Sequence, residues 1–242
     1  RITGSPTTSL TKLGAATWYL SATNSSFTGN VHIKEGVLIV ASLANGGSNS
    51  SLGAGPNSAG KLNFTGGTLR YEGTTAQSTD RLFTINTDGG TLDASGTGVG
   101  TLRFTNTGII SSGAGAGSRI LTLTGTNTGA NLLAGALSNS SGGGALNIVK
   151  SGSGQWILSG NNAYTGTTTV TGGTLLINGN QTAANGAVTV GNGTSLNGTL
   201  GGIGTIGGNT TIQSGSTLSP GDPASAGGVG ILSFNADLHL AS

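Results

Sequence analysis

The chain has 242 residues, of which 48 are glycine, 7% are charged and 34% are hydrophobic, and its formal net charge is +2. Low charge with this apolar content excludes a disordered polyelectrolyte, and the absence of cysteine excludes a disulfide-stapled domain and a cysteine-ligated metal site. The Lys and Arg residues are scattered singly, whereas nucleic-acid binding needs them clustered on one face.

Short runs of alternating apolar and polar residues recur along the whole chain, from 31–35 near the beginning to 232–240 near the end. Strict alternation predicts strands with one buried face, and no segment shows the 3.6-residue period of an amphipathic helix. The glycines predict tight turns between these strands. We expect three longer loops, near 42–60, 111–118 and 222–229.

Two stretches, near 12–40 and near 150–179, are copies of one another. The two tryptophans of the chain, Trp18 and Trp156, align between the copies and are 138 residues apart. Several neighbouring residues align as well, for example Lys12 with Lys150 at the same separation. Within this long repeat, turns rich in glycine return after 20 to 23 residues.

Repeat periods of 20 to 50 residues are typical of solenoids, in which each unit buries its apolar face by stacking on the next. We therefore predict an all-β fold, a right-handed parallel β-helix (β-solenoid) with about 20–23 residues per rung. It should form one domain over residues 1–242.

The second copy, KSGSGQWILSGNNAYTGTTTVTGGTLLING, resembles the passenger-associated transport repeat of autotransporter proteins, also called the autotransporter-associated β-strand repeat. Residues 154–175 follow its pattern G-x-W-x-L-S-G-x-N-x-Y-T-G-x-T-x-V-x-x-G-T-L closely, whereas 14–38 have Ala22 and Thr23 where a glycine belongs. The resemblance implies a β-helix that is secreted or exposed on the surface of a Gram-negative bacterium. Its contact with the outer membrane would run through a C-terminal barrel, which we do not expect within these residues.

The resemblance leads us to expect a non-enzymatic structural or adhesive rod, either an autotransporter-type passenger fragment or a subunit of an extracellular filament. The start at Arg1, without any methionine, leads us to expect a processed protein or a cut fragment. Expected partners are a host or matrix glycan or protein, or copies of the chain stacked end to end through uncapped solenoid ends. No nucleic acid, cofactor, metal ligand or catalytic residue is predicted. The alternative is a glycan-binding or polysaccharide-processing β-helix.

Two glycine motifs imitate nucleotide sites. Residues 202–207 satisfy G-x-G-x-x-G, and GPNSAGK at 55–61 approaches a phosphate loop. Both motifs require a helix directly afterwards, and the dinucleotide fingerprint also requires a preceding strand. Since further glycine turns or a leucine follow instead, we interpret both as loops.

The remaining candidates have simpler structural explanations. Asp80, Asp88 and Asp93 form the densest acidic group, and paired carboxylates can hydrolyse sugars, but aspartates are common in turns. His32 and His239 stand alone on polar faces, which favours surface residues over a metal site.

The aromatic, asparagine and threonine positions of the repeats could also bind ligands. We expect Trp18 and Trp156 to pack inward, not to form exposed sugar platforms. Asn24 and Asn162 should bond within a turn or stack between rungs. Residues 167–169 could belong to an ice-binding face, but regular Thr-x-Thr columns are not visible in the sequence.

Overall fold

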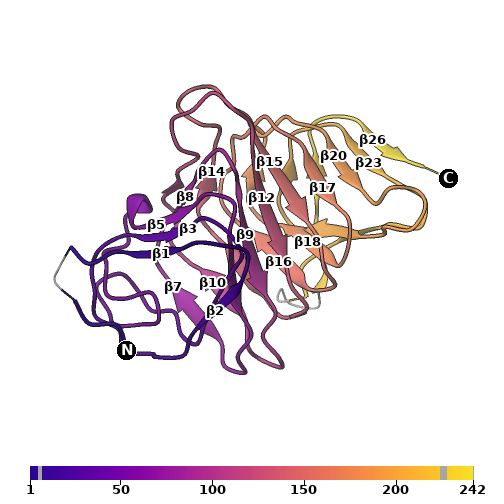
Figure 1. The fold of residues 1–242 in the computed structure, drawn as a ribbon. Helices are drawn as coiled ribbons and strands as arrows, with labels where there is room; N and C mark the ends of the chain where they lie inside the picture. Colours follow the sequence, from indigo (N-terminus) through magenta and orange to yellow (C-terminus); the bar gives the residue numbers. More distant parts are fainter. Residues whose placement is uncertain (5–6, 224–227, 242) are drawn as a thin grey trace.

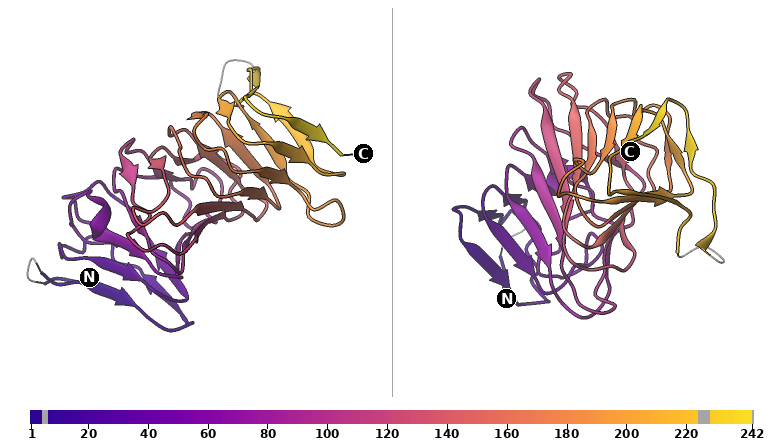
Figure 2. Two further views of the ribbon diagram at one scale, coloured as in Figure 1. Left: turned by 90° about the horizontal axis from the view of Figure 1, so that it is seen from above. Right: turned by 90° about the vertical axis from the view of Figure 1, so that its right-hand side faces the viewer.

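The computed structural model describes residues 1–4, 7–223 and 228–241, and its strands wind into a parallel β-helix with three faces (Figure 1). Each strand pairs in parallel with strands one rung before or after it. The N- and C-termini lie at opposite ends of an elongated molecule (Figure 2). The predicted parallel β-helix is confirmed. Of the loop expected near 222–229, residues 224–227 lie outside the described residues.

The longest face is a ten-stranded sheet, hereafter the long sheet. Its strands, in spatial order, are β2 (Thr17–Leu20), β4 (Val37–Val40), β6 (Thr68–Tyr71), β9 (Gly90–Ala94), β12 (Arg119–Thr124), β15 (Leu146–Lys150), β17 (Thr168–Val170), β20 (Val188–Val190), β23 (Thr210–Ile212) and β26 (Leu238–Leu240).

The second face is a seven-stranded sheet. It contains β7 (Gln77–Thr79), β10 (Leu102–Phe104), β13 (Asn131–Leu133), β16 (Gln155–Leu158), β18 (Thr174–Ile177), β21 (Thr199–Gly202) and β24 (Thr217–Pro220).

The third face consists of three shorter sheets in succession. They are formed by β1 (Leu10–Lys12), β3 (Val31–Ile33), β5 (Leu62–Phe64) and β8 (Thr84–Ile85), then β11 (Ile109–Ile110) and β14 (Ala136–Leu137), then β19 (Asn180–Gln181), β22 (Thr205–Ile206) and β25 (Ser233–Phe234). A parallel bridge between Thr84 and Ser111 joins the first two sheets. The named helical element among the described residues is one short 3-10 turn, η1 (Ala59–Lys61).

The rungs have two kinds of length, a short form and a longer form with inserted loops. Along the long sheet, paired residues lie 20 to 23 positions apart at five steps, for example Thr168 and Val188. The other four steps take 27 to 31 positions, as between Val37 and Thr68. The predicted length therefore holds where no loop interrupts the rung.

The interior is filled by apolar side chains that stack from rung to rung. Phe64, Phe83 and Phe104 form edge-to-face pairs with ring centroids 5.4 Å apart. Leu121 and Leu123 of β12 are fully buried, while Thr122 between them faces outward. Because each rung covers the apolar surface of its neighbour, the fold is stabilised along its whole axis.

Glycine columns occupy the corners where the chain turns between faces. Gly166, Gly186 and Gly208 stack in successive rungs, and a Cβ on either of the last two would overlap the carbonyl oxygen of the glycine one rung before. The corner thus brings backbone against backbone, which only glycine permits. This packing explains much of the high glycine content.

The two sequence repeats occupy different faces of the β-helix. The first spans β1 to β4 and lies on the third face and the long sheet, whereas the second spans β15 to β18 and lies on the long sheet and the seven-stranded sheet. The second copy is thus displaced by one face. Each copy contributes two strands to each of two faces, so it covers more than one rung.

Candidate functional site

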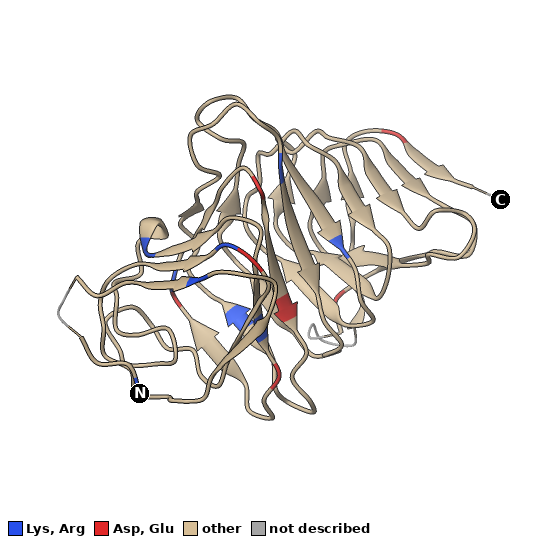
Figure 3. Cartoon of the chain, viewed as in Figure 1, with Lys and Arg blue, Asp and Glu red and all other residues tan. Residues whose placement is uncertain are grey.

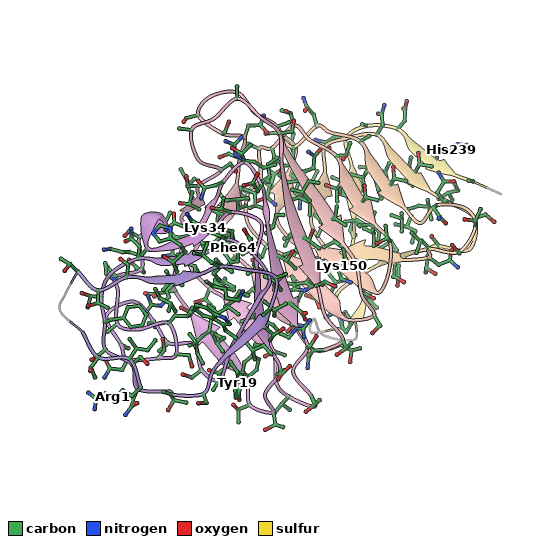
Figure 4. All side chains as sticks on the ribbon, viewed as in Figure 1. Arg1, Tyr19, Lys34, Phe64, Lys150 and His239 are labelled. Carbon is green, nitrogen blue, oxygen red and sulfur yellow. The ribbon has the colours of Figure 1, made fainter. Side chains whose placement is uncertain are left out.

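A groove of about 660 Å³ lies at the corner between the third face and the long sheet. Lys34, Glu35 and Asp88 line it together with Thr65 and small residues of the turns. Figure 4 labels Lys34 among the N-terminal rungs of the molecule. Two acidic residues, Glu35 and Asp88, therefore border the same groove.

The three aspartates that the sequence groups together are separated in the structure. Asp80 accepts hydrogen bonds from the Gly46 amide at 2.7 Å and from Asn57 at 3.0 Å, and so it pins a loop. Asp93 pairs with Arg70 at 2.7 Å on the outside of the long sheet. Of the three, Asp88 alone reaches the groove. Among the described residues, no group of three His, Asp or Glu side chains could hold a metal ion.

Two buried lysines hold equivalent turns in the two repeats. Lys150 Nζ donates to the carbonyl oxygens of Ser151, Gly152 and Gly172 at 2.7 to 3.0 Å. Lys12 Nζ donates in the same way to Leu13, Gly14 and Glu35. Both side chains are fully buried. The third acceptor in each set belongs to the next rung, so each lysine fastens two rungs together.

Two buried arginines act similarly on inserted loops. Arg81 donates to Ala44 at 3.2 Å and to Gly53 at 2.8 Å, while Arg119 donates to the carbonyls of Gly115 and Gly117. Burial lowers the pKa of Arg81, and nearby Asp80 opposes this. These cations are structural, so the outer surface is poorer in charge than the composition suggests, most visibly toward the C-terminus (Figure 3).

Two buried titratable groups give the fold a pH optimum. Burial lowers the pKa of Lys150 to about 8 and raises that of Tyr164 to about 12, the latter partly opposed by a hydrogen bond with Thr168. In the unfolded chain these values are about 10.4 and about 10. Between about pH 8 and 10 the unfolded state holds more protons on Lys150, so stability rises with pH. Between about pH 10 and 12 the folded state keeps the Tyr164 proton, so stability falls.

We therefore expect the urea midpoint of unfolding to peak near about pH 10. Denaturation series across this range, followed by circular dichroism, measure it. The matched variant Tyr164→Phe should lose the decline on the alkaline side and keep the rise. A midpoint that falls steadily from neutral pH would contradict the assignment of these two groups.

The two tryptophans have different environments. Trp156 is fully buried, and its Nε1 donates to the Thr124 carbonyl at 2.9 Å, as the prediction of inward packing requires. Trp18 is 40% exposed, so the same prediction is wrong for the first repeat. The reason is its position: β2 is the first strand of the long sheet, and no described strand lies on its outer edge. Lys12 Nζ lies 5.3 Å from the Trp18 ring centroid.

The asparagine and histidine positions also differ in burial, and only the asparagines follow the pattern of the tryptophans. Asn162 is buried and accepts a hydrogen bond from the Leu137 amide at 2.9 Å, which is the expected bond between rungs. Asn24 is exposed. His32 is half-buried on β3, and His239 is exposed on the last strand (Figure 4).

The glycine motifs lie in β-structure. Residues 202–207 include the end of β21 and all of β22, and 55–61 end in the 3-10 turn η1. Among the described residues, no helix follows either motif, and none is long and apolar enough to cross a membrane.

The structure reveals a column of threonines that sequence reasoning did not find. One outward position of the long sheet is aligned by strand register through all ten strands, and it is occupied by Thr17, Val37, Thr68, Thr91, Thr122, Val149, Thr169, Thr189, Thr211 and His239. We call this the threonine column. Loops of variable length between the strands hide the column in the sequence. Aligning the strands by their buried leucines would have revealed it.

Comparison with known proteins agrees with this architecture. The family model of the passenger-associated-transport-repeat matches residues 10–40 and 148–177. The adhesin BmaC autotransporter of Brucella suis biovar 1 (strain 1330) is 38% identical over 173 residues. The match includes 71% of this chain and 5% of that protein, so the chain spans a small part of its relative. A search of solved structures found no significant match.

These similarities indicate a cell-surface or extracellular location in a Gram-negative bacterium. The four strands of each matched segment are those that the buried Lys12 and Lys150 fasten together. The chain therefore carries passenger-associated-transport repeats of the autotransporter passenger type, built into a parallel β-helix.

Proposed function

We propose that the chain is a non-enzymatic segment of an adhesive surface rod, with residues 1–242 acting as a single β-helix. The observation that carries the proposal is the role of the buried cations. Four positively charged side chains are buried and donate hydrogen bonds to backbone carbonyls of turns and loops, namely Lys12, Arg81, Arg119 and Lys150. Such groups hold a scaffold together and are not available to a substrate. The similarity to an autotransporter adhesin supports the adhesive part.

The proposal predicts that the purified chain adheres to surfaces without altering them. Beads coated with the chain should bind to cultured epithelial cells above the level of beads coated with albumin, and free chain should compete. Incubation with a panel of polysaccharides should release no new reducing ends. Equal retention of both bead types would contradict adhesion, and released reducing ends would contradict the non-enzymatic assignment.

A second candidate is polysaccharide processing at the groove, because Glu35 and Asp88 both line it. Most glycoside hydrolases use a pair of Asp or Glu side chains at the scissile bond. If this candidate holds, reducing ends appear and Asp88→Asn abolishes them while leaving the fold intact.

End-to-end contact between copies is a further element of the proposal. Among the described residues, apolar side chains are exposed on the first and last strands of the long sheet, where Trp18 is 40% and Leu240 is 62% exposed. Both strands have one unpaired edge, and such edges pair readily with other chains. Electron microscopy at increasing concentration should show rods of increasing length. Rods of constant length at all concentrations would contradict this contact.

A further inference from the structure

The threonine column is set apart from the other outward positions by its free hydroxyl groups. None of its seven threonines has a side-chain hydrogen bond within the described residues, whereas Thr167 and Thr171 beside it bond to Asn147 and to the Lys150 carbonyl. The hydroxyls of the column are therefore left to water or to a ligand. A threonine on a strand also has few side-chain rotamers, so each hydroxyl and methyl is held in a narrow range of positions.

The spacing of the column is that of the sheet itself. Register places Thr169, Thr189 and Thr211 directly beside one another on β17, β20 and β23. Neighbouring strands lie about 4.8 Å apart, so hydroxyl and methyl groups repeat at this interval along the axis. The regularity has one dimension, because the flanking outward positions vary, with Asn147 and Thr167 on one side and Ser151 and Thr171 on the other.

The middle of the column is also uncharged. On β12, β15, β17, β20 and β23 the charged residues are Arg119 and Lys150, and both are buried. The charged residues on the other strands of the long sheet are Arg70 and Asp93, which pair with each other on β6 and β9. This part of the surface offers no attraction to a polyanion or a polycation. It offers donors, acceptors and methyl groups in a row.

We propose that the threonine column is a binding track for a neutral polysaccharide, which lies extended along the helix axis. Hydroxyl groups of the sugars exchange hydrogen bonds with the threonine hydroxyls, and the threonine methyls contact the apolar faces of the sugar rings. A single regular column suits a linear chain better than a two-dimensional lattice such as ice. The proposal rests on the adhesive function and names the class of molecule that this face recognises.

Affinity electrophoresis of the folded 242-residue chain tests the proposal. Gels contain mannan, laminarin, dextran or xylan, with heparin as the charged comparison. We expect one or more of the neutral polysaccharides, and not heparin, to retard the chain. The triple variant Thr169→Val, Thr189→Val and Thr211→Val should bind at least about tenfold more weakly, since each lost hydrogen bond reduces affinity severalfold. Valine already occupies the column at Val37 and Val149, so the variant is expected to fold.

The matched control is Thr174→Val with Thr199→Val, an adjacent outward pair on the seven-stranded sheet, which should leave binding unchanged. Equal weakening by both variants, or retardation by heparin alone, would overturn the proposal. If no neutral polysaccharide retards the chain, the track is wrong, and arrest of ice-crystal growth by the chain would then indicate a lattice ligand instead. Cell adhesion of coated beads that persists without glycan binding separates this failure from failure of the adhesive function.

Discussion

Replacing Gly186 by alanine is expected to destabilise the fold by about 3 kcal/mol or more. The new Cβ would overlap the carbonyl oxygen of Gly166 one rung earlier. The atoms that it would meet are backbone atoms of Gly166 and Thr165, so the strain cannot be relieved by a change of side-chain rotamer. Thermal and urea unfolding of the purified variant measure the loss.

The control is Gly60→Ala. A Cβ at Gly60 has no atom within 4 Å, and this glycine lies in the short turn η1, away from the corner stacks. Its stability should stay within about 0.5 kcal/mol of the parent chain, as for most surface substitutions. Equal effects at Gly186 and Gly60 would show that the glycine columns do not pack backbone on backbone as described.

Trp156→Ala is expected to destabilise the chain by about 3–5 kcal/mol, the range for removal of a large buried aromatic side chain. The indole is fully buried, and its removal also leaves the Thr124 carbonyl without its donor. Denaturant unfolding, followed by circular dichroism, gives the free energy directly.

The repeat supplies its own control, since Trp18 is the equivalent residue. Trp18 is 40% exposed on the first strand of the long sheet, so Trp18→Ala should cost about 1 kcal/mol or less. A loss at Trp18 as large as that at Trp156 would mean that the ring is covered in solution, for example by another copy of the chain. The difference in stability loss between the two variants thus shows whether the first strand of the long sheet is exposed in solution.

The fold could be predicted because its determinants are local. Alternating runs such as 232–240 indicate strands, and the repeated tryptophan segments give the solenoid. The displacement of the second repeat by one face could not be predicted. It depends on the number of strands that the chain forms between the two copies. Insertions such as residues 41–61 hide that number in the sequence.

The candidate sites were less accessible to sequence reasoning. The environment of Trp18 depends on the rung beside it, which a local pattern does not contain. The threonine column depends on register: Thr91 and Thr122 are neighbours in space although 31 residues separate them, whereas Thr169 and Thr189 are separated by 20. A column with such unequal intervals has no fixed period in the sequence.

The strand register is the central claim, and disulfide formation between introduced cysteines tests it most directly, because the chain has no cysteine of its own. Thr169 and Thr189 are direct neighbours on β17 and β20, so the double variant Thr169→Cys, Thr189→Cys should crosslink under mild oxidation. Thr169→Cys with Ala187→Cys, on the same face but two residues out of register, should not. Crosslinking of the second pair in preference to the first would contradict the register and, with it, the β-helix described here.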